Sequence, residues 1–395
     1  MGVGASIYSE ELEKPLDGSD VSGEGAAVAE VTRLRRLLLL RRRPTTGVMV
    51  DCGSGHTGII CYNIMTTPAA NGIQYSTVVQ HAKLSVRNAE GGNFPLTEAF
   101  ANNTTELFVS QLQRALAALD GGGFRPELLF VGATGGVRAA IRDGVVAEEQ
   151  VAAFSAALHE VFDATIRVVN FEVLDGTLEA RWELDAAQVI WGGKNAPGGG
   201  DGGSIGLFSG GGQSMQLGRP QEEPLSFPFS TMFPEFEERS GASPDAWLDA
   251  DAWKRYEDTL VAKVAEEHSK RPLLEGSYVG TAMNHRAAMH SGIAGRALSC
   301  REAVSVLRTT LPQFRTKSGP LYDKMMAERK GGAAHSKYPL ERITALHTLR
   351  LVTTLEMLFS PDAQFFFAKN GLGPDGNVLD CEWTLGAFLE EVEKS

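Results

Sequence analysis

The sequence has little cysteine. Its 395 residues include only Cys52, Cys61, Cys300 and Cys381, and no two of them have CxxC spacing. Zinc-binding and thioredoxin-type sites, which need closely spaced cysteine pairs, therefore have no support. Four scattered thiols in so long a chain do not form a disulfide framework either. They indicate a reducing compartment, and we expect an intracellular, cytoplasmic protein.

Long apolar runs and an excess of basic residues are also absent. No stretch approaches the ~20 apolar residues of a membrane-spanning helix, and the acidic start of the chain has no apolar signal core. With 37 Lys and Arg against 49 Asp and Glu, the formal net charge is -12. This balance argues against nucleic acid as a partner, because binding a phosphate backbone needs a basic surface. An acidic chain can still bind phosphates through a metal ion and backbone N–H groups.

The first 44 residues differ in texture from the rest. Residues 1–44 are rich in Gly, Ser and charge, and they predict a flexible leader with a basic end at 41–43. The chain begins with a pattern that fits myristoylation of Gly2. Two interpretations remain: weak peripheral membrane association through an acyl chain and the basic cluster, or a chance match in a flexible tail. The sequence does not reveal the oligomeric state.

From residue 45 onward, strand and helix patterns alternate. Apolar runs at 48–50, 59–62, 128–131 and 166–173 predict strands, and helical periodicity predicts helices over 105–119, 151–161 and 177–191. The first two strands flank the Gly-rich turn 52–55 and predict a hairpin. Alternation of this kind is typical of an α/β lobe.

A second Gly-rich hairpin follows a break at 197–203. Residues 205–208 and 215–217 predict strands on either side of the turn 209–212. The segment 240–360 is mostly helical in texture, and 383–392 predicts a short terminal helix. Each half of the chain thus contains one strand–Gly turn–strand unit. Glycines let a backbone approach a phosphate closely, so two such turns facing each other across a cleft would clamp a polyphosphate.

Five segments in order resemble those of the apyrases, which are nucleoside di- and triphosphatases. Residues 50–57 are similar to the family's Asp-x-Gly-Ser-x-x-Thr loop, and 132–138 to its Ala-Thr-Ala-Gly-x-Arg segment. Residues 176–180 stand in place of Gly-x-Glu-Glu-Gly, and 209–216 resemble Asp-Leu-Gly-Gly-x-Ser-x-Gln. Residues 382–386 match Trp-Thr-Leu-Gly near the end of the chain.

The resemblance implies an α/β protein with a two-lobed, actin-like (ribonuclease-H-like) fold and a phosphate-binding cleft between the lobes. We expect lobe I to comprise 45–172 and 375–395, and lobe II to comprise 173–374, after the leader 1–44. Exopolyphosphatases share this fold, and 338–342 faintly resembles them.

The resemblance also implies roles for individual residues. Asp51 would hold Mg²⁺ or Ca²⁺ through water, Glu179 would be the base that activates the attacking water, and Ser214 and Gln216 would position that water. The phosphate-binding residues would be Gly53, Ser54, Gly55, His56, Thr57, Thr134, Arg138, Gly210, Gly211, Gly212 and Gln213. Hydrolysis of a terminal phosphate needs these parts: an in-line water, a carboxylate and a cation.

Some positions depart from the family pattern. Ser209 replaces the Asp of the fourth segment, and a hydroxyl is a poorer partner than a carboxylate for a hard cation. Leu178 replaces the first Glu of the third segment, and Ala180 its Gly. The paired cysteines of secreted apyrases are absent. Without the resemblance, Glu179 and Glu183 would read as solvated acids on a helix surface.

The leading hypothesis is metal-dependent hydrolysis of the terminal phosphate of nucleoside tri- and diphosphates. One alternative keeps the enzyme class and changes the substrate to polyphosphate or a guanosine alarmone. Another is a catalytically weakened, nucleotide-binding pseudoenzyme, and Ser209 motivates it.

Overall fold

The computed structural model describes residues 44–53, 55–68, 74–192, 205–211, 214–227, 248–329, 339–372 and 377–394. The chain divides into two units, of which one is Thr45–Glu391. The description below concerns Thr45–Glu391. The leader and its Gly2 lie outside the described residues, as do Ser54, Gly212 and Gln213.

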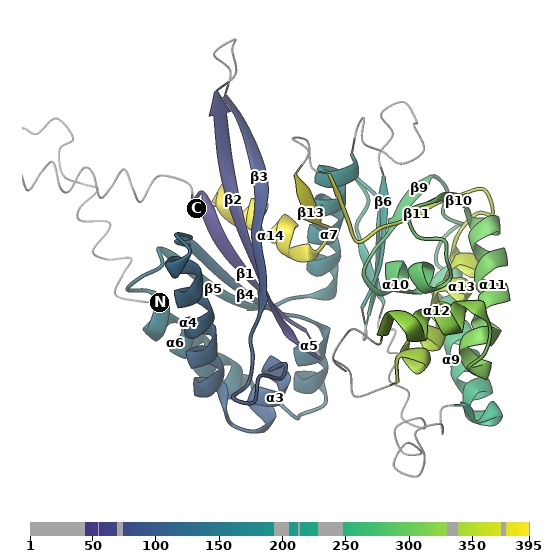
Figure 1. The fold of residues 1–395 in the computed structure, drawn as a ribbon, viewed down its shortest axis with the longest axis horizontal. Helices are drawn as coiled ribbons and strands as arrows, with labels where there is room; N and C mark the ends of the chain where they lie inside the picture. Colours follow the sequence, from purple (N-terminus) through teal and green to yellow (C-terminus); the bar gives the residue numbers. More distant parts are fainter. Residues whose placement is uncertain are drawn as a thin grey trace, which may run out of the picture. The chain divides into compact units, whose positions relative to one another are not determined.

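A five-stranded sheet has the order β3-β2-β1-β4-β5. Its strands are β1 (Thr46–Cys52), β2 (Thr57–Pro68), β3 (Gln74–Ser85), β4 (Leu128–Ala133) and β5 (Val168–Val173). The first three pair antiparallel, whereas β1, β4 and β5 pair parallel. Figure 1 shows β2 and β3 reaching beyond the other strands. The connecting helices are α3 (Leu96–Ala101), α4 (Thr105–Gly121), α5 (Gly135–Arg142) and α6 (Glu148–Phe162).

Both faces of this sheet are covered, which explains the unbroken apolar run of β4. Leu129 and Val131 belong to the core formed with α3, α4 and α6. Phe130 points to the other face, where its ring lies 5.6 Å from that of Trp182 and 6.2 Å from that of Trp383. Side chains alternate along a strand, so a strand buried on both faces has no polar positions.

A six-stranded sheet has the order β10-β11-β9-β6-β7-β8. Its strands are β6 (Gly206–Gly210), β7 (Met215–Gly218), β8 (Leu225–Phe227), β9 (Ser277–Gly280), β10 (Ala297–Ser299) and β11 (Gln364–Phe367). Its helices include α9 (Ala250–His268), α10 (Ala282–His290), α11 (Cys300–Thr316), α12 (Pro320–Arg329) and α13 (Leu340–Leu358). A small pair, β12 (Asn370–Leu372) and β13 (Val378–Asp380), follows.

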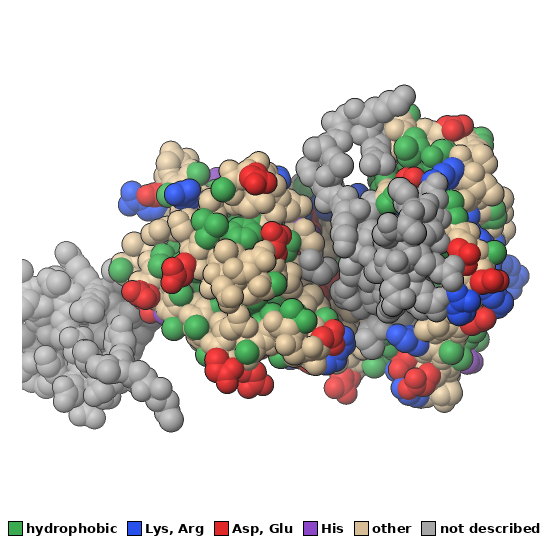
Figure 2. Space-filling view, turned by 90° about the horizontal axis from the view of Figure 1, so that it is seen from below, with side chains coloured by type: hydrophobic (Ala, Val, Ile, Leu, Met, Phe, Trp, Pro, Cys, Tyr) green, Lys and Arg blue, Asp and Glu red, His purple; other side chains and the backbone are tan. Residues whose placement is uncertain are grey.

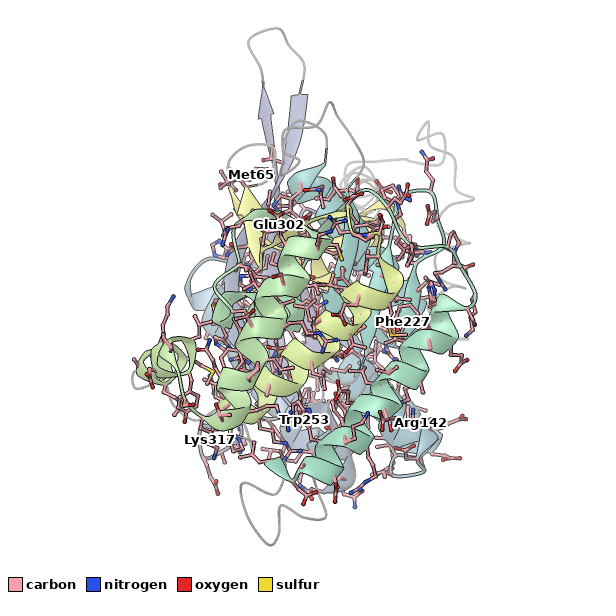
Figure 3. The ribbon with its side chains drawn as sticks, turned by 90° about the vertical axis from the view of Figure 1, so that its right-hand side faces the viewer. Met65, Arg142, Phe227, Trp253, Glu302 and Lys317 are labelled. Atoms are coloured by element: carbon pink, nitrogen blue, oxygen red, sulfur yellow. The ribbon has the colours of Figure 1, made fainter. Side chains whose placement is uncertain are left out.

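Helix α13 is buried along almost its whole length. It packs against α9, α10 and α11, and Figure 3 shows α11 and α13 side by side, with the labelled Trp253 on α9. The buried stretch includes polar residues, among them Arg350 and His347, which are hydrogen-bonded to each other at 2.9 Å. This core therefore contains a polar layer that must be satisfied internally.

Two helices join the sheets through aromatic packing. They are α7 (Gly176–Trp191) and α14 (Trp383–Lys394). The rings of Trp182 and Trp383 stack at 6.0 Å and 26°. A Cβ on Gly386 would lie 2.1 Å from the Trp182 carbonyl oxygen, so only glycine permits this close approach of α14 to α7.

The structure confirms the α/β fold class and both predicted Gly-turn hairpins. The predicted helices at 105–119, 151–161, 177–191 and 383–392 are also present. All four cysteines are buried and free. In the described ranges, no helix is long and apolar enough to cross a membrane. On the face seen in Figure 2, exposed hydrophobic side chains lie scattered among charged ones. The lobe boundaries stay a prediction.

Candidate active site

The first Gly-rich turn joins β1 to β2. Asp51 pairs with Gly58 and Cys52 with Thr57 across the hairpin. The His56 imidazole covers the turn, since a Cβ on Gly53 would lie 3.8 Å from its Nδ1. Burial lowers the pKa of His56, so the ring favours its neutral form. The Thr57 hydroxyl donates to the Phe94 carbonyl at 2.9 Å, so it can only accept a further hydrogen bond.

Asp51 points to the face of the first sheet that α7 and α14 cover. Val50 and Cys52, its neighbours in β1, belong to the core on the opposite face, and side chains alternate. Asp51 pairs with Gly132 of β4, and a Cβ on Gly132 would lie 2.3 Å from the Trp383 ring. Trp383 therefore lies beside Asp51, as core packing rather than as a surface aromatic.

One oxygen of the Asp51 carboxyl lacks a hydrogen bond of normal geometry. Its Oδ1 is buried and has no hydrogen-bond partner, and the same holds for the Trp383 indole nitrogen. Burial, followed by the nearby carboxylates of Glu382 and Glu179, raises the pKa of Asp51 to about 7. A carboxyl of this kind is ready to accept a cation, because a positive charge would offset the cost of its burial.

The second segment begins at the end of β4. Thr134 donates from its backbone N–H and its hydroxyl to the Cys52 carbonyl, at 3.3 and 3.4 Å. It thereby ties the start of α5 to the first turn. Arg138 lies in the first turn of α5, and its side chain donates from Nη1 to the Leu174 carbonyl at 2.5 Å. The predicted phosphate contacts of Thr134 and Arg138 stay predictions.

Arg138 also forms an ion pair with Glu179. Its Nη2 lies 3.0 Å from Glu179 Oε2. Glu179 is in the first turn of α7, whose N-cap Asp175 accepts from the Thr177 backbone N–H at 2.8 Å. Only 8% of Glu179 is exposed, so the alternative of a solvated surface acid is wrong. Burial raises the pKa of Glu179, and Arg138 opposes that rise.

Glu183 lies one helical turn beyond Glu179, on the same face of α7. It is also 8% exposed, and its Oε2 is buried without a hydrogen-bond partner. Burial, and then the negative charge of Glu179, raises the pKa of Glu183 well above its ordinary value. From the sequence alone, Glu183 is predicted only as a solvated acid on the helix surface. The (i, i+4) spacing from the predicted base was the signal that could have identified it.

The second Gly-rich turn joins β6 to β7. The Gly211 N–H donates to the Ser214 carbonyl at 2.9 Å and closes the turn. Gln216 donates from Nε2 to the Ser214 hydroxyl at 2.9 Å, and both side chains are buried. Ser209 pairs with Gln216 across the hairpin, so the two predicted water-positioning residues lie beside the position at which the apyrase pattern has Asp.

The polar layer of α10 and α13 supports this second turn from behind. A Cβ on Gly210 would lie 2.8 Å from Asn284 Oδ1 and 2.9 Å from Arg350 Nη2, so the backbone approaches both side chains closely. Asn284 donates from Nδ2 to the Phe208 carbonyl at 3.1 Å. The sequence does not predict this support, because Asn284 and Arg350 come from helices 74 and 140 residues beyond Gly210 and nothing local links them to the turn.

Residues of both turns act electrostatically on Glu183. Its electrostatic neighbours are Glu179, Ser209, Glu382 and Asp51. Among the residues that the structure describes, no three His, Cys, Asp or Glu side chains converge as direct metal ligands. The carboxylates and hydroxyls present instead suit a hydrated cation, which proteins often hold through one or two carboxylates, waters and substrate phosphates.

Comparison with known proteins shows the fold. No protein-family model and no curated protein matches the chain. A Ppx/GppA family member from Aquifex aeolicus superposes with a TM-score of 0.53 at 13% identity, covering 89% of this chain and 98% of that one. A nucleoside triphosphate hydrolase from Neospora caninum superposes with a TM-score of 0.50 at 12% identity, covering 93% and 97%. The chain thus has the two-sheet, actin-like ATPase fold of these structures.

Proposed function

We propose that the chain hydrolyses the terminal phosphate of nucleoside tri- and diphosphates, as an apyrase-like phosphoanhydride hydrolase. The observation that carries the proposal is the placement of Glu179. This acid is buried and oriented by Arg138, and it lies near the unsatisfied Asp51. A general base needs a fixed position and a pKa raised toward neutrality.

The roles follow from the contacts. Glu179 accepts the proton of the attacking water, with Arg138 fixing its carboxylate. Ser214 and Gln216 form a hydrogen-bonded pair that orients the water. Backbone N–H groups of the two turns bind phosphate oxygens. Asp51 would hold Mg²⁺ or Ca²⁺ through water, since its unsatisfied oxygen suits a hard cation. That cation supplies charge neutralisation at the phosphate oxygens.

The test is phosphate release from ATP, ADP, GDP and UDP, with and without Mg²⁺ or Ca²⁺. We expect metal-dependent release that falls about 100-fold or more in Glu179→Gln. Asp185→Asn is the matched control, because Asp185 is an exposed acid of the same helix. Equal activity of wild type and Glu179→Gln on every nucleotide would exclude the proposal.

A cavity beside the first turn favours polyphosphate as an alternative substrate. It has a volume of about 480 Å³, and its lining includes His56, Lys83 and Arg87. Lys83 is already ion-paired with Asp380 and Glu382, so Arg87 is the cation beside the turn that would favour a longer polyanion than one nucleotide supplies. Release of phosphate from long-chain polyphosphate, reduced in Arg87→Gln and absent with nucleotides, would select this function. The same assay should measure phosphate release from a guanosine alarmone, the other alternative substrate.

Ser209 favours the third candidate, a nucleotide-binding pseudoenzyme. The hydroxyl of Ser209 is buried and has no hydrogen-bond partner, and it stands where the apyrase pattern has a carboxylate. Calorimetry that detects nucleotide binding, together with no turnover at any metal concentration, would select this reading.

A further inference from the structure

Ser209 points to the face of the second sheet that α7 covers. Its neighbours in β6 point the other way: Phe208 belongs to the core around α13, and Gly210 abuts Asn284 and Arg350. Since side chains alternate along a strand, Ser209 faces the opposite side. Helix α7 packs there, against β6, β7 and β8.

Glu183 is the acid of α7 that meets Ser209. The Ser209 hydroxyl is close enough to the Glu183 carboxyl to act on it as a hydrogen-bond donor. Even so, neither Ser209 Oγ nor Glu183 Oε2 forms a hydrogen bond of normal geometry, and Ser209 is only 1% exposed. Two buried, unsatisfied oxygens side by side are costly unless a further group joins them.

Asp51 contributes a third unsatisfied oxygen to the same region. Its Oδ1 is buried without a partner, and its charge reaches Glu183. Asp51 comes from the first sheet, Ser209 from the second, and Glu183 from the helix that packs on both. Asp51 and Ser209 each point to the face of their own sheet that α7 covers. Oxygens of this kind match the ligands of a hydrated Mg²⁺ or Mn²⁺.

We propose that Glu183 supplies the second carboxylate of the cation site, in place of the acid that the second turn lacks at Ser209. The second carboxylate thus comes from helix α7 and not from strand β6. Asp51 and Glu183 form the acidic pair that holds the hydrated cation. This inference rests on the proposed function, because it concerns the cation of the same site. It also means that Ser209 does not by itself make the chain a pseudoenzyme.

The experiment relocates the carboxylate. Mn²⁺ binding to the full chain is measured by electron paramagnetic resonance, without nucleotide, for wild type, Glu183→Gln and the double variant Ser209→Asp/Glu183→Gln. We expect Glu183→Gln to weaken Mn²⁺ binding about 10- to 100-fold, and the double variant to regain most of it. Asp185→Asn, which removes an exposed acid from the same helix, should bind as wild type does.

Two results would overturn the inference: unchanged Mn²⁺ affinity in Glu183→Gln, or a loss that the folded double variant does not recover. Circular dichroism checks that each variant folds. If Glu183→Gln does not fold, the double variant decides alone, by binding Mn²⁺ or failing to.

Glu179→Gln separates this inference from the proposed function. It should keep its Mn²⁺ affinity while losing hydrolysis. Cation binding through Glu183 without turnover of any nucleotide would refute the proposed function and leave the inference standing.

Discussion

Replacing Arg138 tests the assignment of Glu179 as the base. Arg138→Gln removes the positive charge 3.0 Å from Glu179 Oε2. Burial already raises the pKa of Glu179, and Arg138 is the main group that lowers it. Without Arg138 the carboxyl therefore keeps its proton to higher pH. Loss of a nearby opposite charge moves a carboxyl titration by about 1 to 3 pH units.

The sign of the effect on rate follows directly. A base works only when deprotonated, so the acid limb of the pH–rate profile for kcat should move to higher pH by that amount. At a fixed pH on this limb, each pH unit of displacement costs about tenfold in rate. At high pH the variant should approach wild-type kcat, because the Glu179 carboxylate is then present in both. The assay is initial-rate phosphate release from the best nucleotide across the pH range.

Arg142→Gln is the control, because Arg142 is an exposed residue of the same helix, with 68% of its side chain accessible. It should leave the profile unchanged. If Arg138 acts on the phosphates instead, KM should rise in Arg138→Gln and the limb should stay in place. That outcome, or an equal loss of kcat at every pH, would refute the assignment of Arg138 as the group that positions the base.

Three further predictions concern stability and are checked by chemical denaturation. Gly132→Ala should lower the free energy of unfolding by about 1 to 3 kcal/mol, because its Cβ would lie 2.3 Å from Trp383. The control Gly121→Ala has open space around the new Cβ and should leave the free energy of unfolding unchanged. Equal effects of the two substitutions would show that Trp383 does not pack tightly on Gly132. Burial, followed by the charge of Arg286, lowers the pKa of His290 to about 4. Between pH ~6.5 and about 4 the unfolded state therefore binds a proton that the folded state does not. As the pH is lowered across this window, the free energy of unfolding should decrease by up to about 3 kcal/mol. His290→Gln should reduce the pH slope by about one proton, and an unchanged slope would exclude a buried neutral imidazole. The buried hydroxyls of Tyr62 and Thr384 are hydrogen-bonded at 3.0 Å. Tyr62→Phe removes this partner of Thr384 and should lower the free energy of unfolding by about 1 to 2 kcal/mol. An unchanged free energy of unfolding would show that water replaces the lost hydroxyl.

The hairpins and the main helices could be predicted because their signals are local. In 48–62 and 205–217, apolar strands flank a glycine turn, and the pairing partner is a few residues away. Strand β3 was missed, because Gln74–Ser85 mixes polar and apolar residues along a hairpin that extends beyond the rest of its sheet. Strands β9 and β11 were missed because each has only four residues. They pair with each other across 83 residues of mostly helical sequence.

The residues of the candidate site also differ in whether a local sequence signal predicts them. Asp51 and Glu179 were found through motifs, because each lies in a short segment that resembles a known pattern. Arg350 could not be found like this. It lies in a helix whose polar residues look like a solvated face in the sequence, yet the whole of Arg350 is buried. Only the packing of α13 behind the second turn shows that its guanidinium reaches Gly210.

The two glycine turns look alike in sequence but rest on different physical supports. The first is backed by aromatic packing, with Trp383 over Gly132 and Trp182 stacked on Trp383. The second is backed by hydrogen-bonding side chains, Asn284 and Arg350. Aromatic support depends on volume, so it fails when a methyl group is added. Polar support depends on satisfied donors and acceptors, so it fails when one partner is removed. The acid of the first turn, Asp51, lies on the strand that leads into that turn. For the second turn, we propose that the acid is Glu183 of α7. If Glu179 is the base and Glu183 the second acid, α7 couples the two turns, and displacement of α7 should disturb proton transfer and cation binding together.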